Sequence, residues 1–369
     1  MHRSYNQIID EFVELCHMFS DAIDMIQAGG GNASTKYIDS SKPVMLIKAS
    51  GYLMSEVTKN NGFTAIDAFK VNQLLEDVKK GTIAIDDEHK INKRITSANL
   101  STLRPSIETF LHAMIPVQHV LHIHDLITLL YVSTVDFEDE IKKQWDEDLG
   151  LSEMLLVPYE KPGIHLAMQM MKGLDLYEEK YGKLPKGILL QNHGFIVAHD
   201  DMFKIYENVV SIQDQIKAKI GLPMDFCKAY REGYEIKRAL NKVFSDKSLF
   251  VRLSEDKDLN QYTVTKPSFP DALVFCGLTP LLIDSVDEMS LNEKLVAYKA
   301  AFDEFPKVVI KDDALYFCGE SIKKCLEIQD VLKIQHILAT KLGDRLKTLT
   351  EAQVFALLNW EAEKYRKNL

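Results

Sequence analysis

The segment that decides the fold lies about one third of the way along the chain and reads His119-Val120-Leu121-His122-Ile123-His124. Its short apolar alternation predicts a β-strand, in which successive side chains point to opposite faces. His122 and His124 then share one face, whereas Leu121 and Ile123 point the other way into the core. His119 has the opposite parity to the pair, so we interpret it as a packed, hydrogen-bonded histidine. The segment therefore predicts a buried strand that carries two convergent imidazoles.

Helical and strand-like patterns alternate on both sides of this strand. Apolar residues spaced by three and four predict helices over 8–26, 105–114, 163–181 and 201–219, the first of them ended by Gly29-Gly30-Gly31. Short apolar runs predict strands at 44–47, 117–124 and 188–190, and the polar stretches 56–62 and 79–101 are expected to be loops. This mixture predicts an α/β fold.

A domain boundary is expected near Gly221-Leu222-Pro223, giving a catalytic domain over 1–222 and a smaller α/β accessory domain over 223–369. In the second part, a charged helix is predicted at 230–243. Segments 272–277 and 314–319 are each predicted to be a strand followed by a turn, and helices are predicted at 321–343 and 350–366.

Composition excludes several functional classes. The 369 residues include 44 Lys+Arg and 54 Asp+Glu, a formal net charge of −10, which disfavours nucleic acid and anionic membrane as partners. No apolar run approaches the roughly 18–20 residues of a membrane-spanning helix, and the N-terminus leads into no signal-type core, so a cytoplasmic location is expected. Five cysteines without a Cys-x-x-Cys pair indicate reduced thiols rather than a disulfide framework or a zinc knot.

A third histidine strengthens the His-x-His pattern. His193 lies in Gln191-Asn192-His193-Gly194, at the end of a predicted strand where glycine permits a tight turn. Three neutral imidazoles with an open fourth position are typical of a catalytic zinc site. The alternative is that each is structural: His-x-His is a weak signal alone, and Asn192-His193-Gly194 also fits a plain turn.

A carboxylate and two glycine-containing segments complete the candidate site. Pro105 suits a helix first turn, and Glu108 and His112, four residues apart, then share a face away from the apolar stripe. Glu108 is either a general base facing the metal or a solvated first-turn residue, and His112 is either packing or support for the ligands. Segments 29–34 and 48–51 allow backbone amides to converge on a phosphate, but neither is a nucleotide-binding fingerprint.

Taken together, these residues resemble the class II aldolase/adducin family across roughly the first 220 residues. The resemblance rests on Gly30-Gly31-Asn32-Ala33-Ser34, Lys48-Ala49-Ser50-Gly51, Arg104-Pro105-Ser106-Ile107-Glu108-Thr109, His122-Ile123-His124, Val157-Pro158-Tyr159 and Asn192-His193-Gly194. The form of these motifs is most similar to the aldolase part of bifunctional rhamnulose-phosphate aldolase/short-chain dehydrogenase proteins. A looser resemblance continues through Pro306 to Val309, the helix from Ser321, and Phe355 to Lys364. No GxxxGxG motif occurs, so only the aldolase activity is implied.

The resemblance implies a three-layer αβα sandwich around a mainly antiparallel sheet, assembled as a homotetramer with sites between subunits. By position, it assigns zinc to His122, His124 and His193, catalysis to Glu108, and proton donation to Tyr159. It assigns the substrate phosphate to Asn32, Ser50, Gly51 and Ser106. Ile107 stands where the family's sugar-phosphate aldolases often have a second serine.

The activity implied is zinc-dependent cleavage of a ketose 1-phosphate, of the rhamnulose or fuculose type, to dihydroxyacetone phosphate and an aldehyde through an enediolate. The same site is used by sugar-phosphate epimerases and dehydratases, and the epimerases typically have Asp where this chain has Glu108. A Schiff-base aldolase using Lys48 and a noncatalytic family member are further alternatives. Adducin lacks the metal histidines, so their presence favours an enzyme.

Overall fold

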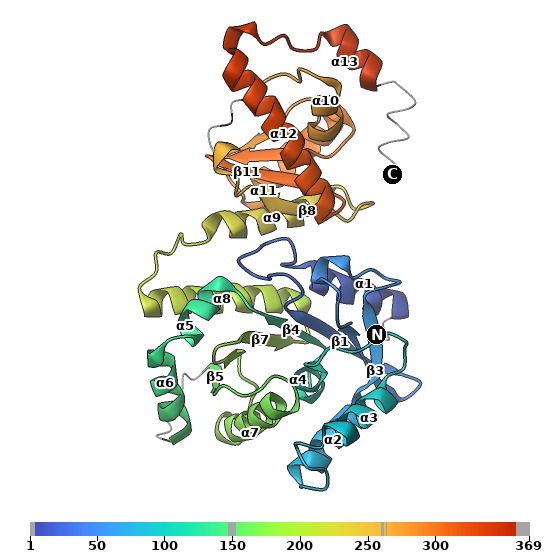
Figure 1. Cartoon of the computed structure of the whole chain (residues 1–369), viewed down its shortest axis with the longest axis vertical. Coiled ribbons are helices and arrows are strands. Elements are labelled where there is room, and N and C mark those ends of the chain that lie inside the picture. The colour runs from blue at the N-terminus through green and yellow to red at the C-terminus, as the bar shows by residue number, and fades with distance from the viewer. Residues whose placement is uncertain (1–3, 147–152, 260–261, 263, 359–369) are drawn as a thin grey trace. The chain divides into compact units, whose positions relative to one another are not determined.

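A seven-stranded sheet forms the centre of the N-terminal unit, Met1–Phe226, in the computed structural model of the chain (Figure 1). The structure describes residues 4–146, 153–259, 262 and 264–358. Across the sheet the order is β3 (Phe63–Asp67), β2 (Lys42–Lys48), β1 (Asn32–Asp39), β4 (His119–Ile123), β7 (Gly194–His199), β6 (Gly187–Leu190) and β5 (Met154–Val157). Neighbouring strands are antiparallel except β5 and β6, which are parallel. The predicted mainly antiparallel sheet is confirmed.

Helices cover both faces of this sheet (Figure 1). On one side α2 (Ala68–Lys79), α3 (Glu88–Ala98), α4 (Thr109–Met114) and α7 (Ile164–Tyr181) share a hydrophobic core with side chains of the sheet. On the other side lie α1 (Tyr5–His17) and α8 (Met202–Ile220), with α5 (Leu126–Val132) against α8 and α6 (Val135–Asp146) against α5 and β5. The three-layer αβα architecture is therefore confirmed.

Two predictions for residues 8–101 of this unit are wrong. The first helix ends at His17 rather than near residue 26, because the chain continues in short turns whose apolar side chains, such as Phe19 and Ile26, are buried all the same. Residues 79–101 are not one long loop, because α3 begins at Glu88 with Asp87 capping its N-terminus. Its apolar stripe is short, because only Ile91 and Ala98 are buried, with Ile95 partly buried between them, and the other residues are polar or charged.

The helix predicted over 105–114 begins only at Thr109, which corrects the interpretation of Pro105 as a first-turn residue. Pro105 instead pairs with Ala49 in an isolated antiparallel bridge, and the Ser50 amide donates to the Arg104 carbonyl at 2.9 Å. The bridge to Ala49 holds Pro105 in an extended segment, which overrides the tendency of proline to occupy the first turn of a helix. It brings the segment after β2 beside the segment before α4 and leaves Glu108 as the cap of a shorter helix.

The C-terminal unit, Cys227–Leu369, has its own four-stranded sheet. The order is β8 (Phe250–Leu253), β11 (Ala314–Gly319), β10 (Val308–Lys311) and β9 (Leu281–Ile283). One hydrophobic core joins the sheet to α9 (Lys228–Val243) and α11 (Glu288–Phe302), and a second joins it to α10 (Pro270–Cys276) and α12 (Ile322–Leu342). The described residues of this unit also form the 3-10 turns η2 (Lys257–Leu259) and η3 (Gly343–Arg345) and the helix α13 (Glu351–Leu358), and those of the N-terminal unit form the 3-10 turn η1 (Met54–Glu56). The smaller α/β part expected from the sequence is therefore present. Its role as an accessory domain stays a prediction.

Segment 272–277 is a helix rather than the predicted strand. Pro270 occupies the start of α10, where its fixed φ suits a helix, and a short apolar run cannot by periodicity alone be assigned to strand or helix. The strand predicted at 314–319 is confirmed as β11. The part of the predicted 350–366 helix beyond residue 358 lies outside the described residues.

All five cysteines are free thiols, as predicted. Burial raises the pKa of the Cys276 thiol to about 12, so at neutral pH it is protonated and a poor nucleophile. Among the described residues, no helix combines the length and apolar character needed to cross a membrane.

Candidate metal centre

Glu108, His122, His124 and His193 converge on one point of the N-terminal unit. One ligand atom from each lies within 4.8 Å of those of the other three. The imidazole centroids are 4.8, 5.0 and 5.1 Å apart, and their planes meet at 70–74°. The Nε2 atoms of His122 and His124 are 2.9 Å apart. Rings that meet edge-on around a shared centre present their nitrogens to a single position.

Strand β4 positions the first two imidazoles. Leu121 and Ile123 alternate with His122 along a strand whose residues are all buried. His119 is packed with its Nδ1 3.0 Å from the Thr35 hydroxyl, in agreement with the prediction from strand parity. Nδ1 of His122 lies 3.1 Å from the Phe195 carbonyl. Since a carbonyl only accepts, that nitrogen carries the proton, and the Nε2 lone pair is left directed at the cluster.

A tight turn between β6 and β7 positions the third imidazole. Asn192 has φ +53° and Gly194 φ +150°, and the His193 amide donates to the Leu190 carbonyl at 3.2 Å. A Cβ atom at Gly194 would lie 2.4 Å from the Ile123 carbonyl oxygen and 2.9 Å from Cδ2 of His124. Glycine is therefore what allows the beginning of β7 to approach the end of β4 closely enough for His193 to join the pair.

Glu108 faces the histidines rather than solvent and is only 6% exposed. Its Oε1 lies 2.8 Å from Nε2 of His193 and 3.5 Å from Nε2 of His122. Its Oε2 accepts a 2.6 Å hydrogen bond from Nδ2 of Asn32. Burial raises the pKa of this carboxyl, but the His122 and His193 rings beside it outweigh burial and hold the pKa below its ordinary value.

The chemistry of these donors fits a divalent cation. Burial, with His122 and His193 acting in the same direction, lowers the pKa of His124 to about 3, so this imidazole is neutral at physiological pH. Neutral imidazole nitrogens and a carboxylate are the ligands that zinc and similar borderline cations prefer. The Nε2 atoms of His122 and His124 also lie at hydrogen-bond distance from each other beside a carboxylate. Several lone pairs therefore point at one position, where a cation would offset their mutual repulsion.

The remaining predicted residues occupy different places around the cluster. Ser50 and Gly51 are exposed in the turn after β2, and Ser106 is half-buried with its Oγ accepting from the Glu108 amide at 3.2 Å. The Tyr159 side chain is 56% exposed, and its backbone amide donates to Oε1 of Gln191 at 2.9 Å. Asn32, by contrast, is buried against Glu108.

Two supporting contacts were not predictable in full from the sequence. His112 is completely buried, with its Nδ1 2.9 Å from the Ser34 hydroxyl, so of the two alternatives it packs and supports α4. The parity of Ser34 with Asn32 on one strand is the signal that would have found it. The Phe195 carbonyl that orients His122 is a backbone group, and no side-chain pattern marks it.

Lys48 is buried beside this site at 3% exposure, where burial lowers the pKa of its amine. Its Nζ donates to the carbonyls of Tyr52 at 2.8 Å and Gly29 at 3.2 Å. An amine bound to two carbonyls ties two turns together, which disfavours the Schiff-base alternative.

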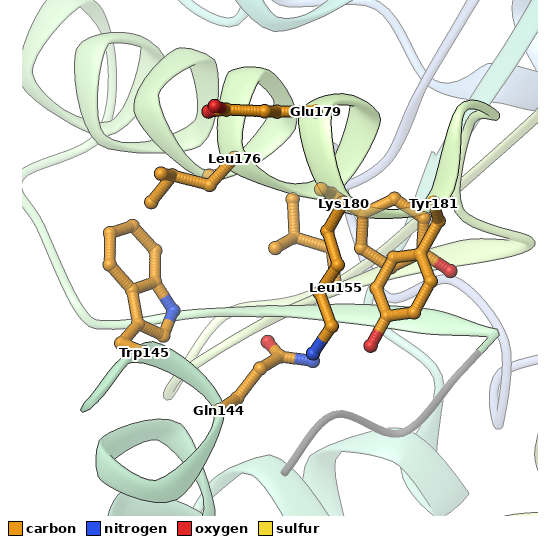
Figure 2. Close-up of a pocket in the computed structure, with 9 residues that line it drawn as sticks. Gln144, Trp145, Leu155, Leu176, Glu179, Lys180 and Tyr181 are labelled. Atoms are coloured by element: carbon orange, nitrogen blue, oxygen red, sulfur yellow. The ribbon is translucent and has the colours of Figure 1, made fainter. Parts of the chain in front are cut away.

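A separate hollow of about 300 Å³ lies between α6, β5 and α7 (Figure 2). It is lined by Gln144, Trp145, Leu155, Gly173, Leu176, Tyr177, Glu179, Lys180 and Tyr181. None of these residues belongs to the predicted site.

Comparison with known proteins identifies the family of the N-terminal part of the chain. Residues 10–220, more than half of the chain, match the family described as class II aldolase and adducin N-terminal domain. A curated relative, "Uncharacterized oxidoreductase YuxG" of Bacillus subtilis (strain 168), is 25% identical over 210 residues, and the match covers 55% of this chain but only 28% of that protein.

Solved structures give more distant similarities. The N-terminal class II aldolase domain of a Thermoplasma acidophilum protein is 24% identical, with a TM-score of 0.46, covering 60% of this chain and 97% of that one. A sugar-phosphate aldolase from Thermotoga maritima is 16% identical, with a TM-score of 0.36, covering 58% of this chain and 93% of that one. On the family match over residues 10–220, the chain belongs to the class II aldolase and adducin N-terminal domain family.

Proposed function

We propose that this protein is a zinc-dependent aldolase that reversibly cleaves a ketose 1-phosphate, of the rhamnulose or fuculose type, to dihydroxyacetone phosphate and an aldehyde. The observation that carries the proposal is the convergence of three imidazoles with one buried carboxylate. The proposed enzyme is cytoplasmic, assembles as a homotetramer and has no nucleic acid or membrane partner.

In this proposal His122, His124 and His193 hold the zinc ion. Bound there, zinc would supply Lewis-acid stabilisation of the negative charge that develops on the substrate oxygens. The protein contributes a site whose ligands are fixed before binding, because the Phe195 carbonyl orients His122 and the Gly194 turn places His193.

Two side chains handle protons. In the cleavage direction the C4 hydroxyl gives up its proton, the C3–C4 bond breaks, its electron pair passes to the C2 oxygen, and the aldehyde leaves. Tyr159 exchanges the proton of the aldehyde oxygen, and Glu108 shuttles a proton to C3 of the remaining fragment to give dihydroxyacetone phosphate. The position of Glu108 Oε1 beside His193 supports its part of this scheme.

The substrate phosphate is assigned to the exposed turn at Ser50 and Gly51 and to Ser106, with Asn32 as the fourth residue of the set. The bridge between Ala49 and Pro105 supports this assignment, since it brings the two segments side by side. Ser106 also accepts from the Glu108 amide, which couples this segment to the catalytic carboxylate.

A panel of ketose 1-phosphates tests the reaction. Rhamnulose 1-phosphate, fuculose 1-phosphate and their stereoisomers are incubated with the protein, and dihydroxyacetone phosphate is measured by coupled reduction to glycerol 3-phosphate. We expect its release, loss of release with a chelator, and recovery with added zinc. Interconversion of sugars without dihydroxyacetone phosphate would favour the epimerase, and loss of water would favour the dehydratase. Borohydride trapping at Lys48 without chelator sensitivity would favour the Schiff-base enzyme.

Replacing Tyr159 by Phe removes only the hydroxyl. We expect kcat for cleavage to fall about 100-fold, the effect of one general acid or base. Deuterium exchange at C3 of dihydroxyacetone phosphate should continue at the wild-type rate, because that step uses Glu108. Unchanged cleavage in Tyr159→Phe would remove this residue from the scheme.

A further inference from the structure

The hollow between α6, β5 and α7 lies apart from the metal centre (Figure 2). Its volume of about 300 Å³ is at the lower end of the range for small-molecule pockets, which is roughly 300–1,000 Å³. None of the nine residues that line it belongs to the group of Glu108 and the three histidines. A ligand in this hollow would therefore not be the substrate of the metal centre.

One face of α7 forms a wall of the hollow. Its residues in the lining are spaced by three and four along the helix, so they lie on one side of it: Gly173, Leu176, Tyr177, Lys180 and Tyr181. Tyr177 is buried, whereas Leu176 is 47% exposed at the opening. An exposed apolar side chain at the edge of a concave surface leaves apolar area that a bound molecule can cover.

The opposite wall is fixed to the edge of the sheet by hydrogen bonds. Nε2 of Gln144 donates to the Met154 carbonyl at 2.9 Å, and its Oε1 accepts from the Leu156 amide at 2.7 Å. Nε1 of Trp145 donates to the Leu156 carbonyl at 2.8 Å. These bonds hold the end of α6 on β5, so this wall is in place before any ligand binds.

Aromatic rings make up much of the lining. Trp145 comes from α6, and Tyr177 and Tyr181 come from α7, with their ring centroids 4.5 Å apart. A Cβ atom at Gly173 would lie 3.2 Å from both Trp145 and Leu155, so glycine allows α7 to approach these two side chains closely. Ring surfaces gathered in this way favour a flat aromatic group, which can stack on them or meet them edge-on.

The charges at the hollow favour an acidic ligand over a basic one. Nζ of Lys180 lies 4.8 Å from the Tyr181 ring centroid, and Figure 2 shows this side chain reaching toward the Gln144 amide. Nζ of Lys172 lies 5.3 Å from the Trp145 ring centroid. Two ammonium groups thus already lie near the rings that would attract a cation. Glu179 also lines the hollow, but it is exposed to water, which screens its charge.

We propose that this hollow binds a small, flat aromatic acid, whose ring lies among Trp145, Tyr177 and Tyr181 and whose carboxylate pairs with Lys180. The site is separate from the three histidines, so binding needs neither zinc nor a sugar phosphate. The proposal therefore does not depend on the proposed aldolase function, and each can fail without the other.

Calorimetric titration of the full chain with 1-naphthoate tests the ligand class. We expect one molecule bound per chain, with the same Kd after a chelator has removed divalent metal. The uncharged 1-naphthamide should bind about threefold more weakly, the usual scale of one partly exposed charge pair. The saturated decahydronaphthalene-1-carboxylate should bind about fivefold more weakly, because it cannot make aromatic contacts. No heat of binding with about 5 mM 1-naphthoate, or tighter binding of 1-naphthylmethylammonium, would overturn the proposal.

Substitutions at the opening test the location. Leu176→Trp fills the hollow from an exposed position and should weaken the binding of 1-naphthoate at least about tenfold. Lys180→Met keeps the apolar stem and should weaken 1-naphthoate about threefold while leaving 1-naphthamide unchanged. Lys93→Met, at an exposed lysine of α3 outside the lining, is the matched control and should keep the wild-type Kd.

All three substituted side chains are exposed, so the thermal unfolding midpoint should stay near that of the wild type in each variant. A folded Leu176→Trp protein that binds 1-naphthoate with the wild-type Kd would place the ligand elsewhere and overturn the proposal.

Discussion

Glu108→Gln should lower kcat for cleavage by about 10³-fold, which makes it the substitution with the largest expected effect on turnover. Gln has nearly the shape of Glu and keeps an oxygen that can accept from Asn32, whose Nδ2 now bonds Oε2 at 2.6 Å. It loses the ability to accept and release a proton. Deuterium exchange at C3 of dihydroxyacetone phosphate should stop together with cleavage.

Metal content separates this effect from collapse of the site. Zinc measured by mass spectrometry should stay near the wild-type level in Glu108→Gln, because the three histidines remain. Glu207→Gln on α8, an exposed carboxylate paired with Lys204, is the matched control and should behave as wild type. A Glu108→Gln protein with wild-type turnover would contradict the assigned role.

Gly194→Ala should weaken metal binding and lower activity together. The added Cβ would meet the Ile123 carbonyl oxygen at 2.4 Å and Cδ2 of His124 at 2.9 Å. The first of these atoms is backbone and cannot turn aside, so β4 and β7 must separate, and His193 leaves the other imidazoles. We expect at least a tenfold weaker Kd for zinc and a loss of about 1–3 kcal/mol in the free energy of unfolding, measured with urea.

Gly182→Ala is the control for the backbone conformation alone. Gly182 has φ +63° at the end of α7, and a Cβ there would meet nothing within 4 Å. It should cost about 1 kcal/mol of stability and leave zinc affinity unchanged. If Gly194→Ala bound zinc as tightly as Gly182→Ala, the close approach of the two strands would not be what assembles the site.

The convergence of His122 and His124 could be predicted because strand alternation is a local property. The alternation of the apolar Leu121 and Ile123 with His122 and His124 already assigns the histidines to one face. The turn that contains His193 could be predicted from the sequence. The distance of His193 from His122 and His124 could not, because it depends on how closely β7 approaches β4. That approach is a tertiary contact, and Gly194 gives only an indirect sign of it.

Helix boundaries near the site were less predictable, for physical reasons. Pro105 favours a helix start in isolation, but its bridge to Ala49, a residue far away in sequence, holds this segment extended and delays α4 to Thr109. The orientation of Glu108 follows from that delay and from the amide of Asn32. Ala49 and Asn32 both lie far from Glu108 along the chain. Apolar periodicity alone therefore could not decide whether the Glu108 carboxylate is catalytic or solvated.

The most direct test of the central claim is the amount of metal bound by the purified protein and its histidine variants. We expect about one zinc ion per wild-type chain, and at least a tenfold loss of affinity in each of His122→Ala, His124→Ala and His193→Ala. His119→Ala, which removes a packed histidine on the opposite face of β4, should retain the metal. A wild-type chain that binds no divalent metal, or a His193→Ala chain that binds it with unchanged affinity, would contradict the claim.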